Sequence, residues 1–403
     1  MYFPGTARQG RCGGEVIPNA ARGDCFAGKN ALLATLAPYV ICLANHAGVT
    51  DGDFRGRLVS NQTVPLNQYF ALPKVELHRH LEGSLRLTTM LDIANQHGVT
   101  VPESMYKLSG LVQVQDQDPM TFTNFLDKFK TLRLFYKSPD VIHRVTREAV
   151  EDAARDHIRY LELRFTPVAL SRAEGFPLHD VMDWVITSAQ DAAKKSKIKV
   201  GLIASVNRHE SADLAEQVAW LAAEHMKDGL VGIDLAGNEA EFKTEPFYGI
   251  FKEAKQAGLH LTIHAGEWGP AANVRDALEN LDAERIGHGV RVMEDESIVA
   301  LAKERGVAFE VCVTSNYQSG VVRSLPEHPL PRMMAAGLNV TINTDDPSIS
   351  RITLSHEYQH VCEDLKIPMD ELKQSVLRAA QASFLNEAEK TKFIASLKKE
   401  LKL

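Results

Sequence analysis

Short runs of β-prone residues alternate with longer stretches of helical period along most of the chain, and this alternation restricts the possible folds more than any other feature of the sequence. Eight such runs follow one another between Leu72 and Asn343. Repeated strand-helix units of this kind build a parallel sheet. The runs are Lys74–His78, Tyr160–Phe165, Lys199–Val206, Val231–Leu235, His260–His264, Arg285–His288, Ala308–Val313 and Asn339–Asn343.

The stretches between these runs carry apolar residues at three- and four-residue spacing, which predicts amphipathic helices. Eight strands with alternating helices predict an α/β fold of the (β/α)8 TIM barrel class. The gap between the first two runs is far longer than the others, so we expect extra helices inserted after the first strand, over residues 121–136 and 139–156, near the mouth of the barrel. The expected outer helices include Leu178–Lys194, Ala212–Met226, Pro246–Gln256, Asn273–Leu281 and Glu294–Arg305.

The first 70 residues differ in texture from the rest of the chain. They are rich in Gly, Ala and Asn, contain three of the five cysteines and show no sustained helical or strand period. This composition predicts a poorly ordered N-terminal arm over residues 1–70, followed by one barrel domain over residues 71–403. We interpret the arm either as a regulatory or targeting extension or as an addition without effect on the fold.

The overall charge argues against nucleic acid as a partner and favours a small molecule. The formal net charge is -7 and the pI is near 6.1, whereas neutralising phosphates requires a surplus of Lys and Arg. The longest apolar run, Ala31–Ala44, contains Pro38 and is shorter than the ~20 residues of a membrane helix, so we expect no membrane span. The five cysteines form no CxxC pair, which favours a reducing, cytoplasmic location over a cleaved targeting segment.

The positions of chemically reactive residues test the barrel prediction, because barrel enzymes use the carboxyl ends of their strands. Polar residues cluster where the predicted strands end, so this end of the barrel is the expected site. The clusters are His78-Arg79-His80, Gly237-Asn238-Glu239, His264-Ala265-Gly266-Glu267, His288 and Asp345-Asp346.

Three histidines and one aspartate in this set predict a metal site. His78 and His80 are two residues apart at a strand end, so both side chains face the same side. The pair alone is weak evidence, but His264 ends the fifth run and Asp345 follows the eighth. Three imidazoles and one carboxylate suit a single Zn²⁺, which lowers the pKa of a bound water molecule from 15.7 to roughly 7. The alternatives are a core histidine at His264 and a helix N-cap at Asp345, before Pro347.

Two further residues are candidates for proton transfer. Glu267 lies three residues beyond His264, in the loop after the strand, and is the expected proton donor unless it is an exposed loop carboxylate. His288 stands between Gly287 and Gly289 at the end of the sixth run, where it would orient or deprotonate the attacking water. The alternative for His288 is a core histidine with backbone partners.

Six segments of the chain resemble the adenosine deaminase family. The likeness runs from about Leu72 to near the C-terminus, and six such motifs do not recur in order by chance. The segments are Pro73-Lys-Val-Glu-Leu-His-Arg-His-Leu-Glu-Gly-Ser, Asp234-Leu-Ala-Gly-Asn-Glu, His264-Ala-Gly-Glu, Arg285-Ile-Gly-His-Gly, Thr314-Ser-Asn and Asn343-Thr-Asp-Asp-Pro.

The resemblance implies hydrolytic deamination of adenosine and 2′-deoxyadenosine, with inosine and ammonia as the products from adenosine. Glu267 would protonate purine N1 as hydroxide adds to C6, and His288 would steer the attacking oxygen. Asp346 would meet N7, and the backbone N–H of Gly237 would meet N3. The implied ligands of one Zn²⁺ per chain are His78, His80, His264 and Asp345. The implied substrate contacts are His80, Glu82, Gly237 and Asp346.

Two positions depart from the family pattern. Glu82 stands where nucleoside-specific members usually have an aspartate that meets the ribose 5′-hydroxyl, whereas related adenine deaminases have glutamate. Arg285-Ile-Gly-His and Thr314-Ser-Asn look more like the adenosine enzymes, so the balance favours adenosine over adenine or another adenosine derivative. Val313 stands where the family commonly has proline, which is expected to loosen a turn without affecting the chemistry.

Three other classes of protein share single features with this chain. A binuclear amidohydrolase has the barrel and the H-x-H pair but uses a modified lysine at the fourth strand end, and residues 231–239 contain no lysine, which favours one metal ion. A non-catalytic binding protein would keep the barrel alone, yet all the proposed ligands and Glu267 are present. Nucleic-acid deaminases have a combined H-x-E and P-C-x-x-C signature that is absent here. The sequence carries no signal for an oligomeric state.

Overall fold

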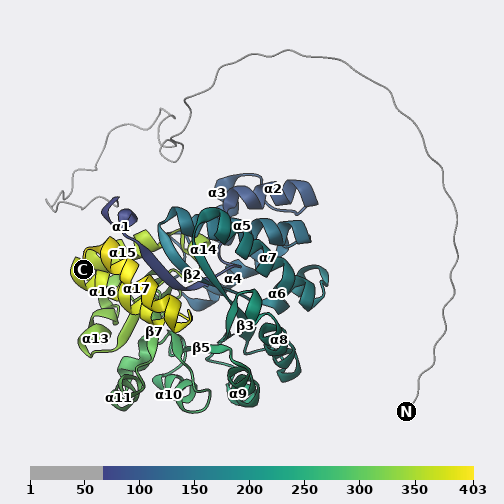
Figure 1. Cartoon of the computed structure of the whole chain (residues 1–403). Helices are drawn as coiled ribbons and strands as arrows, with labels where there is room; N and C mark the ends of the chain where they lie inside the picture. The colour runs from purple at the N-terminus through teal and green to yellow at the C-terminus, as the bar shows by residue number, and fades with distance from the viewer. Residues whose placement is uncertain (1–66) are drawn as a thin grey trace, which may run out of the picture. The chain divides into compact units, whose positions relative to one another are not determined.

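Eight parallel strands form one sheet that curls into a nearly closed barrel, with helices around its outside (Figure 1). The computed structural model describes residues 67–403. Each strand pairs with its sequence neighbours in the order β1-β2-β3-β4-β5-β6-β7-β8, so the predicted (β/α)8 TIM barrel is confirmed. The strands are β1 Lys74–His80, β2 Ile158–Phe165, β3 Lys199–Asn207, β4 Leu230–Ala236, β5 His260–Ala265, β6 Arg285–His288, β7 Ala308–Val311 and β8 Asn339–Ile342.

The inner face of the barrel is polar, whereas the outer face of the strands is apolar. In β2, Leu161 and Leu163 alternate with Glu162 and Arg164, and all four are buried. Arg164 donates across the interior to Glu310 of β7 at 2.7 Å, so the charged residues are the ones that face inward. The apolar alternates pack under the helices, and the barrel interior is held by hydrogen bonds and ion pairs.

The first and last strands meet at a seam formed by the backbone of Asp345. Its N–H donates to the carbonyl of His78 at 3.0 Å, and its carbonyl accepts from the N–H of His80 at 2.8 Å. The backbones of Arg79 and Asp345 thereby form an isolated parallel bridge. Helix α16 (Met369–Ala382) packs against both β8 and β1, so it covers this seam.

Four helices follow β1 before β2, which confirms the predicted insertion. Ser138 begins the last of them by accepting a hydrogen bond from the N–H of Val141, and Pro139 occupies the first turn, where its missing N–H costs nothing. The insertion lies beside the strand ends, and its third helix lines the pocket described below. The inserted helices are α2 Leu87–His97, α3 Met105–Val112, α4 Phe122–Leu132 and α5 Pro139–Arg155.

The remaining long helices surround the barrel, as predicted from their amphipathic spacing (Figure 1). Four helices after β8 complete the fold and had no counterpart among the predicted elements. The outer helices are α6 Pro167–Glu174, α7 Leu178–Ser196, α8 Ala212–Glu224, α9 Tyr248–Ala257, α10 Ala271–Glu279, α11 Glu296–Arg305, α12 Val313–Gln318, α13 Leu330–Ala335, α14 Pro347–Ser350, α15 Leu354–Glu363, α16 and α17 Glu387–Leu401. Short 3₁₀ turns are η1 Arg133–Phe135, η2 Met226–Asp228, η3 Glu245–Phe247, η4 Val290–Glu294 and η5 Leu325–Glu327.

Strand β7 ends two residues earlier than predicted, because Val313 begins helix α12. The N–H of Val313 donates to the buried carboxylate of Glu357 at 2.8 Å, and the N–H of Thr314 donates to it at 3.1 Å. Proline has no N–H and could not make the first of these bonds. Valine therefore adds an anchor at the turn where the sequence predicted a looser chain.

The predicted N-terminal arm lies outside the described residues except for its last four. Residues 67–70 belong to helix α1 (Asn67–Ala71), so the last four residues of the predicted arm are helical. The buried Lys74 ammonium group donates to the carbonyls of Phe70 and Leu72 and so ties this helix to β1. Across residues 67–403, we find no helix with the length and hydrophobicity needed to cross a membrane.

Candidate active site

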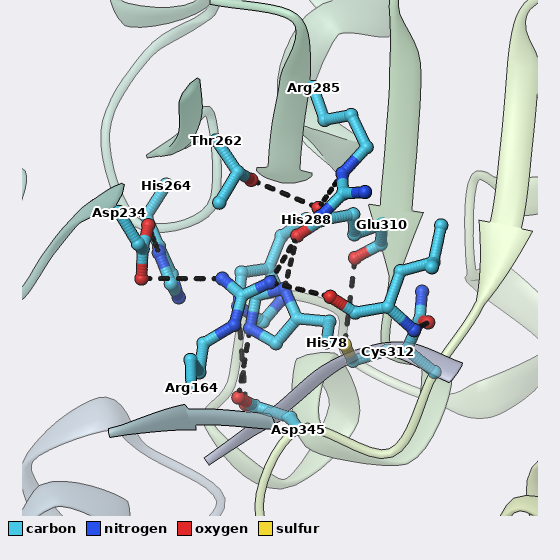
Figure 2. Close-up of polar contacts among 12 residues, drawn as sticks. His78, Arg164, Asp234, Thr262, His264, Arg285, His288, Glu310, Cys312 and Asp345 are labelled. Atoms are coloured by element: carbon cyan, nitrogen blue, oxygen red, sulfur yellow. Dashed lines mark hydrogen bonds and ion pairs between the residues drawn. The ribbon is translucent and has the colours of Figure 1, made fainter. Parts of the chain in front are cut away.

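Four histidines and one aspartate converge at the carboxyl ends of the strands. Donor atoms of His78, His264, His288 and Asp345 all lie within 4.8 Å of one another, and Figure 2 shows these side chains gathered in the barrel. His80 joins them, since its Nε2 lies 3.4 Å from Asp345 Oδ1, and His78 Nε2 lies 3.2 Å from the same oxygen. The four predicted ligands are thus brought together, and His288 lies among them.

Two of these histidines are oriented by carboxylates. His78 Nδ1 lies 2.8 Å from Glu310 Oε2, and His264 Nδ1 lies 2.9 Å from Asp234 Oδ1. A carboxylate accepts the Nδ1 proton and leaves the lone pair on Nε2, which is the usual arrangement of metal-binding histidines. His78 Nε2 is buried and has no aligned hydrogen-bond partner within residues 67–403. This donor set therefore fits a zinc ion.

Arg164 fixes the two carboxylates in turn. It donates to Glu310 at 2.7 Å and lies 3.3 Å from Asp234, and Figure 2 shows it between them. Burial alone would raise the pKa of Glu310, but Arg164 and Arg285 hold it well below its ordinary value. Burial likewise opposes ionisation of Asp234, but His264 and Arg164 lower its pKa. Both groups stay ionised and serve as fixed acceptors.

The protons of the cluster respond to the same surroundings. Burial lowers the pKa of His80 and of His288 well below the ordinary value, so both rings are neutral near pH 7. Burial and Arg164 also act to lower the pKa of His78, but Asp345 and Glu310 outweigh them and raise it. A proton on His78 would compete with a metal ion, so metal affinity should fall in acid.

Glu267 is a buried carboxylic acid beside this cluster. Its side chain is 5% exposed, which rules out the alternative of an exposed loop carboxylate, and its Oε2 lies 3.6 Å from His288 Nε2. Burial raises its pKa well above the ordinary value, and the negative charge of Asp345 raises it further. Glu239 holds the loop in place by accepting the N–H groups of Gly266 and Glu267. The arrangement therefore favours the protonated form of Glu267.

Asp346 and Glu82 lie in the same pocket with unused hydrogen-bonding capacity. Asp346 Oδ1 and Glu82 Oε2 are buried, and neither finds a hydrogen-bond partner in the described part of the chain. Burial raises the pKa of both groups, with the nearby Asp345 charge adding to the effect on Asp346. Glu82 Oε1 accepts the N–H of Thr166 at 2.6 Å. Gly237, with a φ of 93°, follows β4 and lines the pocket beside them.

The pocket has one polar wall and one apolar wall. Its open space is about 710 Å³, including solvent at the mouth. The acids and histidines form the polar wall, and Phe125, Leu126 and Phe129 of α4 face them together with Trp268. Phe122 packs next to Trp268 with ring centroids 5.7 Å apart. Such a space suits a flat, largely apolar ring whose edge carries hydrogen-bonding atoms.

Two residues of the cluster have left-handed backbones. His288 has a φ of 56° and Asp345 a φ of 67°, a conformation that costs an ordinary side chain free energy. His288 is the last residue of β6, and Asp345 lies three residues beyond the end of β8. The turn directs each side chain into the site as the chain leaves the barrel, which a continuing strand would not do.

Comparison with known proteins identifies the family. A family model for adenosine deaminase matches residues 73–400. The chain belongs to the adenosine deaminase family. An adenosine deaminase from Clostridium perfringens is 35% identical to it over 326 residues, covering 81% of this chain and 98% of that relative. The protein is therefore a deaminase, a hydrolytic enzyme, and not the non-catalytic barrel that the sequence left as an alternative.

Solved structures of similar proteins share the barrel of this deaminase. Adenine deaminase from Arthrobacter aurescens has a TM-score of 0.76 at 28% identity, covering 82% of this chain and 100% of that one. An amidohydrolase from Burkholderia ambifaria with bound zinc has a TM-score of 0.78 at 26% identity, covering 86% and 95%. Arabidopsis N6-mAMP deaminase has a TM-score of 0.74 at 27% identity, covering 83% and 99%. By their names, these relatives act on more than one purine compound.

Several residues that shape the active site of this deaminase had no role assigned in the sequence prediction, although Glu239 and Asn316 lie within its motifs. Glu310 and Arg164 orient the histidines, and Glu239 holds the Glu267 loop. Asn316 contacts His288, and His328 contacts Asn316. The sequence did contain a signal for Arg164, because Glu162 and Arg164 alternate with apolar residues inside a buried strand. No local pattern marks His328, which follows a short turn.

Proposed function

We propose that this enzyme hydrolyses the 6-amino group of adenosine and 2′-deoxyadenosine, giving inosine or 2′-deoxyinosine and ammonia. The observation that carries the proposal is Glu267, a buried carboxyl group 3.6 Å from His288 and beside a histidine-aspartate cluster, where burial raises its pKa and favours the protonated form. Hydrolytic deamination of a purine needs such a proton donor next to an activated water molecule. The pocket is lined by this acid, by His80, His264 and Asp345, which are among the residues proposed to hold the metal ion that activates the water, and by apolar side chains that suit the purine ring.

One Zn²⁺ per chain is the proposed cofactor, with His78, His80, His264 and Asp345 as ligands. The buried Nε2 of His78, 3.2 Å from Asp345 Oδ1, and the carboxylate contacts of His78 Nδ1 and His264 Nδ1 support this assignment. His288 is left out because its Nδ1 faces the amide of Asn316 and not a carboxylate. Bound zinc would supply a water molecule of pKa roughly 7 in place of 15.7. The zinc-containing relative from Burkholderia ambifaria supports the choice of metal.

The residues of the chain would then act on the purine as follows. Glu267 donates its proton to N1, so the ring accepts the electron pair when the water oxygen adds at C6. N7 accepts hydrogen bonds, and the raised pKa of Asp346 gives it a proton to donate there. The N–H of Gly237 meets N3, and His288 orients the attacking oxygen. One proton of the water molecule restores Glu267 and the other passes to the amino nitrogen, so that ammonia leaves C6 and the ring regains its aromaticity.

The substrate beyond the purine ring depends on the side of the pocket that contains Glu82. Glu82 and Thr166 line the pocket, and the Oε2 of Glu82, which has no hydrogen-bond partner among residues 67–403, could accept a hydrogen bond from a sugar hydroxyl, which supports a nucleoside. Glutamate at this position is also the observation that favours the second candidate, adenine or another adenosine derivative, and adenine is the substrate named for the Arthrobacter aurescens relative. Arg133, which lines the same pocket, would suit a 5′-phosphate.

The test compares kcat/KM for adenosine, 2′-deoxyadenosine, adenine and AMP by the loss of ultraviolet absorbance. We expect the two nucleosides to be the best substrates, and a higher kcat/KM for adenine or AMP would contradict the proposal. Metal analysis should find one zinc ion per chain, whereas two would indicate a binuclear amidohydrolase. Removal of the metal with a chelator should abolish turnover, and added Zn²⁺ should restore it. A cytoplasmic location stays a prediction.

A further inference from the structure

A chain of hydrogen bonds runs from the backbone of helix α13 to His288 through two buried side chains. The N–H of Leu330 donates to His328 Nδ1 at 3.1 Å. His328 Nε2 lies 3.3 Å from Asn316 Oδ1, and Asn316 Nδ2 lies 3.1 Å from His288 Nδ1. The exposed fractions of His328, Asn316 and His288 are 3%, 0% and 1%, so water does not compete for these bonds. We call this chain the relay.

The first donor fixes the direction of every bond in the relay. A backbone N–H can only donate, so Nδ1 of His328 is unprotonated and the ring carries its proton on Nε2. Burial lowers the pKa of His328 to about 3, which agrees with a neutral ring. The Nε2–H of His328 donates to Asn316 Oδ1, which turns the amide nitrogen of Asn316 toward His288. An amide nitrogen also only donates, so Nδ1 of His288 is unprotonated.

His288 therefore carries its proton on Nε2, the nitrogen that faces the pocket. That atom lies 3.6 Å from Glu267 Oε2 and 4.0 Å from Asp345 Oδ2. We propose that Asn316 and His328 are positioning residues that hold His288 in this tautomer, so that it donates a hydrogen bond to the attacking water oxygen and does not remove its proton. The inference rests on the role proposed above for His288.

The relay gives His288 a different tautomer from that of the two histidines that carboxylates orient. Glu310 and Asp234 accept the Nδ1 protons of His78 and His264, which leaves lone pairs on Nε2 for a metal ion. Asn316 donates to Nδ1 of His288 and leaves a proton on Nε2, where no lone pair is available for a metal ion or for a proton. The partner of Nδ1 thus decides whether a histidine in this cluster binds metal or donates a hydrogen bond.

The direct test reads the protonation of the ring nitrogens. Two-bond ¹H–¹⁵N spectra of the zinc-loaded protein with ¹⁵N-labelled histidine distinguish a protonated from an unprotonated nitrogen, and His288→Gln assigns the His288 signals. We expect Nε2 to be protonated in the wild type. Asn316→Asp places an acceptor at Nδ1 and should move the proton there. Turnover of adenosine should then fall about 10- to 100-fold in kcat with little change in KM, the range typical of groups that orient an active-site histidine.

Two substitutions of His328 provide a matched pair. His328→Gln keeps an N–H that can donate to Asn316 Oδ1 and should retain the wild-type tautomer and most of the activity. His328→Phe keeps the ring but offers no donor, so His288 should show both tautomers and kcat should fall. Zinc content and thermal stability measured on each variant separate this effect from misfolding. A proton on Nδ1 of wild-type His288, or an unchanged tautomer in Asn316→Asp, would overturn the inference. The spectra need no substrate, so a wrong substrate assignment would leave their result intact.

Discussion

Opposite influences act on two sets of buried carboxylates in the barrel. Asp234 and Glu310 lie inside strands, contact Arg164 and have lowered pKa values. Glu267 and Asp346 lie in the loops beyond the strand ends, where burial and the charge of Asp345 raise their pKa values. The first set accepts the Nδ1 protons of histidines. The second set keeps protons of its own.

The difference shows how one barrel can place bases and acids a few ångströms apart. A carboxylate within the strands can reach an arginine across the interior, whereas a carboxylate beyond the strand end faces the pocket and its apolar wall. Environments that push the pKa values of similar groups apart are a common way to assign acid and base roles. For these four groups, contact with Arg164 favours the ionised form, and burial beside Asp345 favours the protonated form.

The largest expected effect comes from removing the acid of the second set. Glu267→Gln keeps the shape of the side chain but cannot donate the same proton, so we expect kcat for adenosine to fall by about 10²- to 10⁴-fold. Steady-state release of ammonia measures the loss, and metal analysis should show that zinc is retained. The exposed Glu241→Gln should behave as the wild type. Unchanged turnover in Glu267→Gln would remove the acid role.

A second substitution removes the arginine that contacts both carboxylates of the first set, Asp234 and Glu310. Arg164→Met leaves Asp234 and Glu310 buried without their shared cation, so we expect the free energy of unfolding to fall by about 3–5 kcal/mol. Urea unfolding followed by circular dichroism measures the change. The matched control is Arg172→Met, whose side chain is 59% exposed and pairs with Glu210, where we expect less than about 1 kcal/mol. Equal losses in both variants would mean that the buried pairing has no special weight.

Glu357, which is not one of the proposed catalytic residues, tests whether burial raises the pKa of a carboxyl group in this protein. Burial raises its pKa to about 7, so the protonated form is favoured in the folded state. The stabilisation is complete below the ordinary value of 4.5 and is lost as the pH rises through about 7. Glu357→Gln removes this titration, so its unfolding free energy relative to the wild type should rise by about 3 kcal/mol between pH 4.5 and pH 8. A constant difference across this range in urea unfolding would contradict the assignment.

The smallest effect is expected at Glu82, the pocket carboxyl group that we propose to contact the sugar. Glu82→Asp shortens the side chain by one methylene group and should raise the preference for adenosine over adenine by about tenfold, at the low end of what one methylene achieves. The ratio of the two kcat/KM values measures it. Glu304→Asp, at an exposed position, should leave the ratio unchanged. A shift toward adenine would show that Glu82 does not contact the sugar.

The sequence predicted the strands and their reactive ends because both leave local signals. Alternation of β-prone runs and amphipathic stretches located all eight strands, and His78, His264 and Asp345 marked their ends. The partners of these residues come from distant strands, as with Arg164 and Glu310, and a local pattern cannot show which two strands face each other across the barrel. The end of β7 was misplaced because Val313 continues an apolar run in the sequence. In the structure its N–H donates to the carboxylate of Glu357, which is distant in sequence, and Val313 begins a helix.

Asp345 contributes both to the closure of the barrel and to the candidate metal site. Its backbone joins the last strand to the first, and its carboxylate faces the histidines of the first strand. An ion held there would link positions 267 residues apart, which the chain brings together only after the intervening strands have assembled. Tight metal binding would therefore require the complete barrel, because a partly folded barrel would not bring all four proposed ligands together.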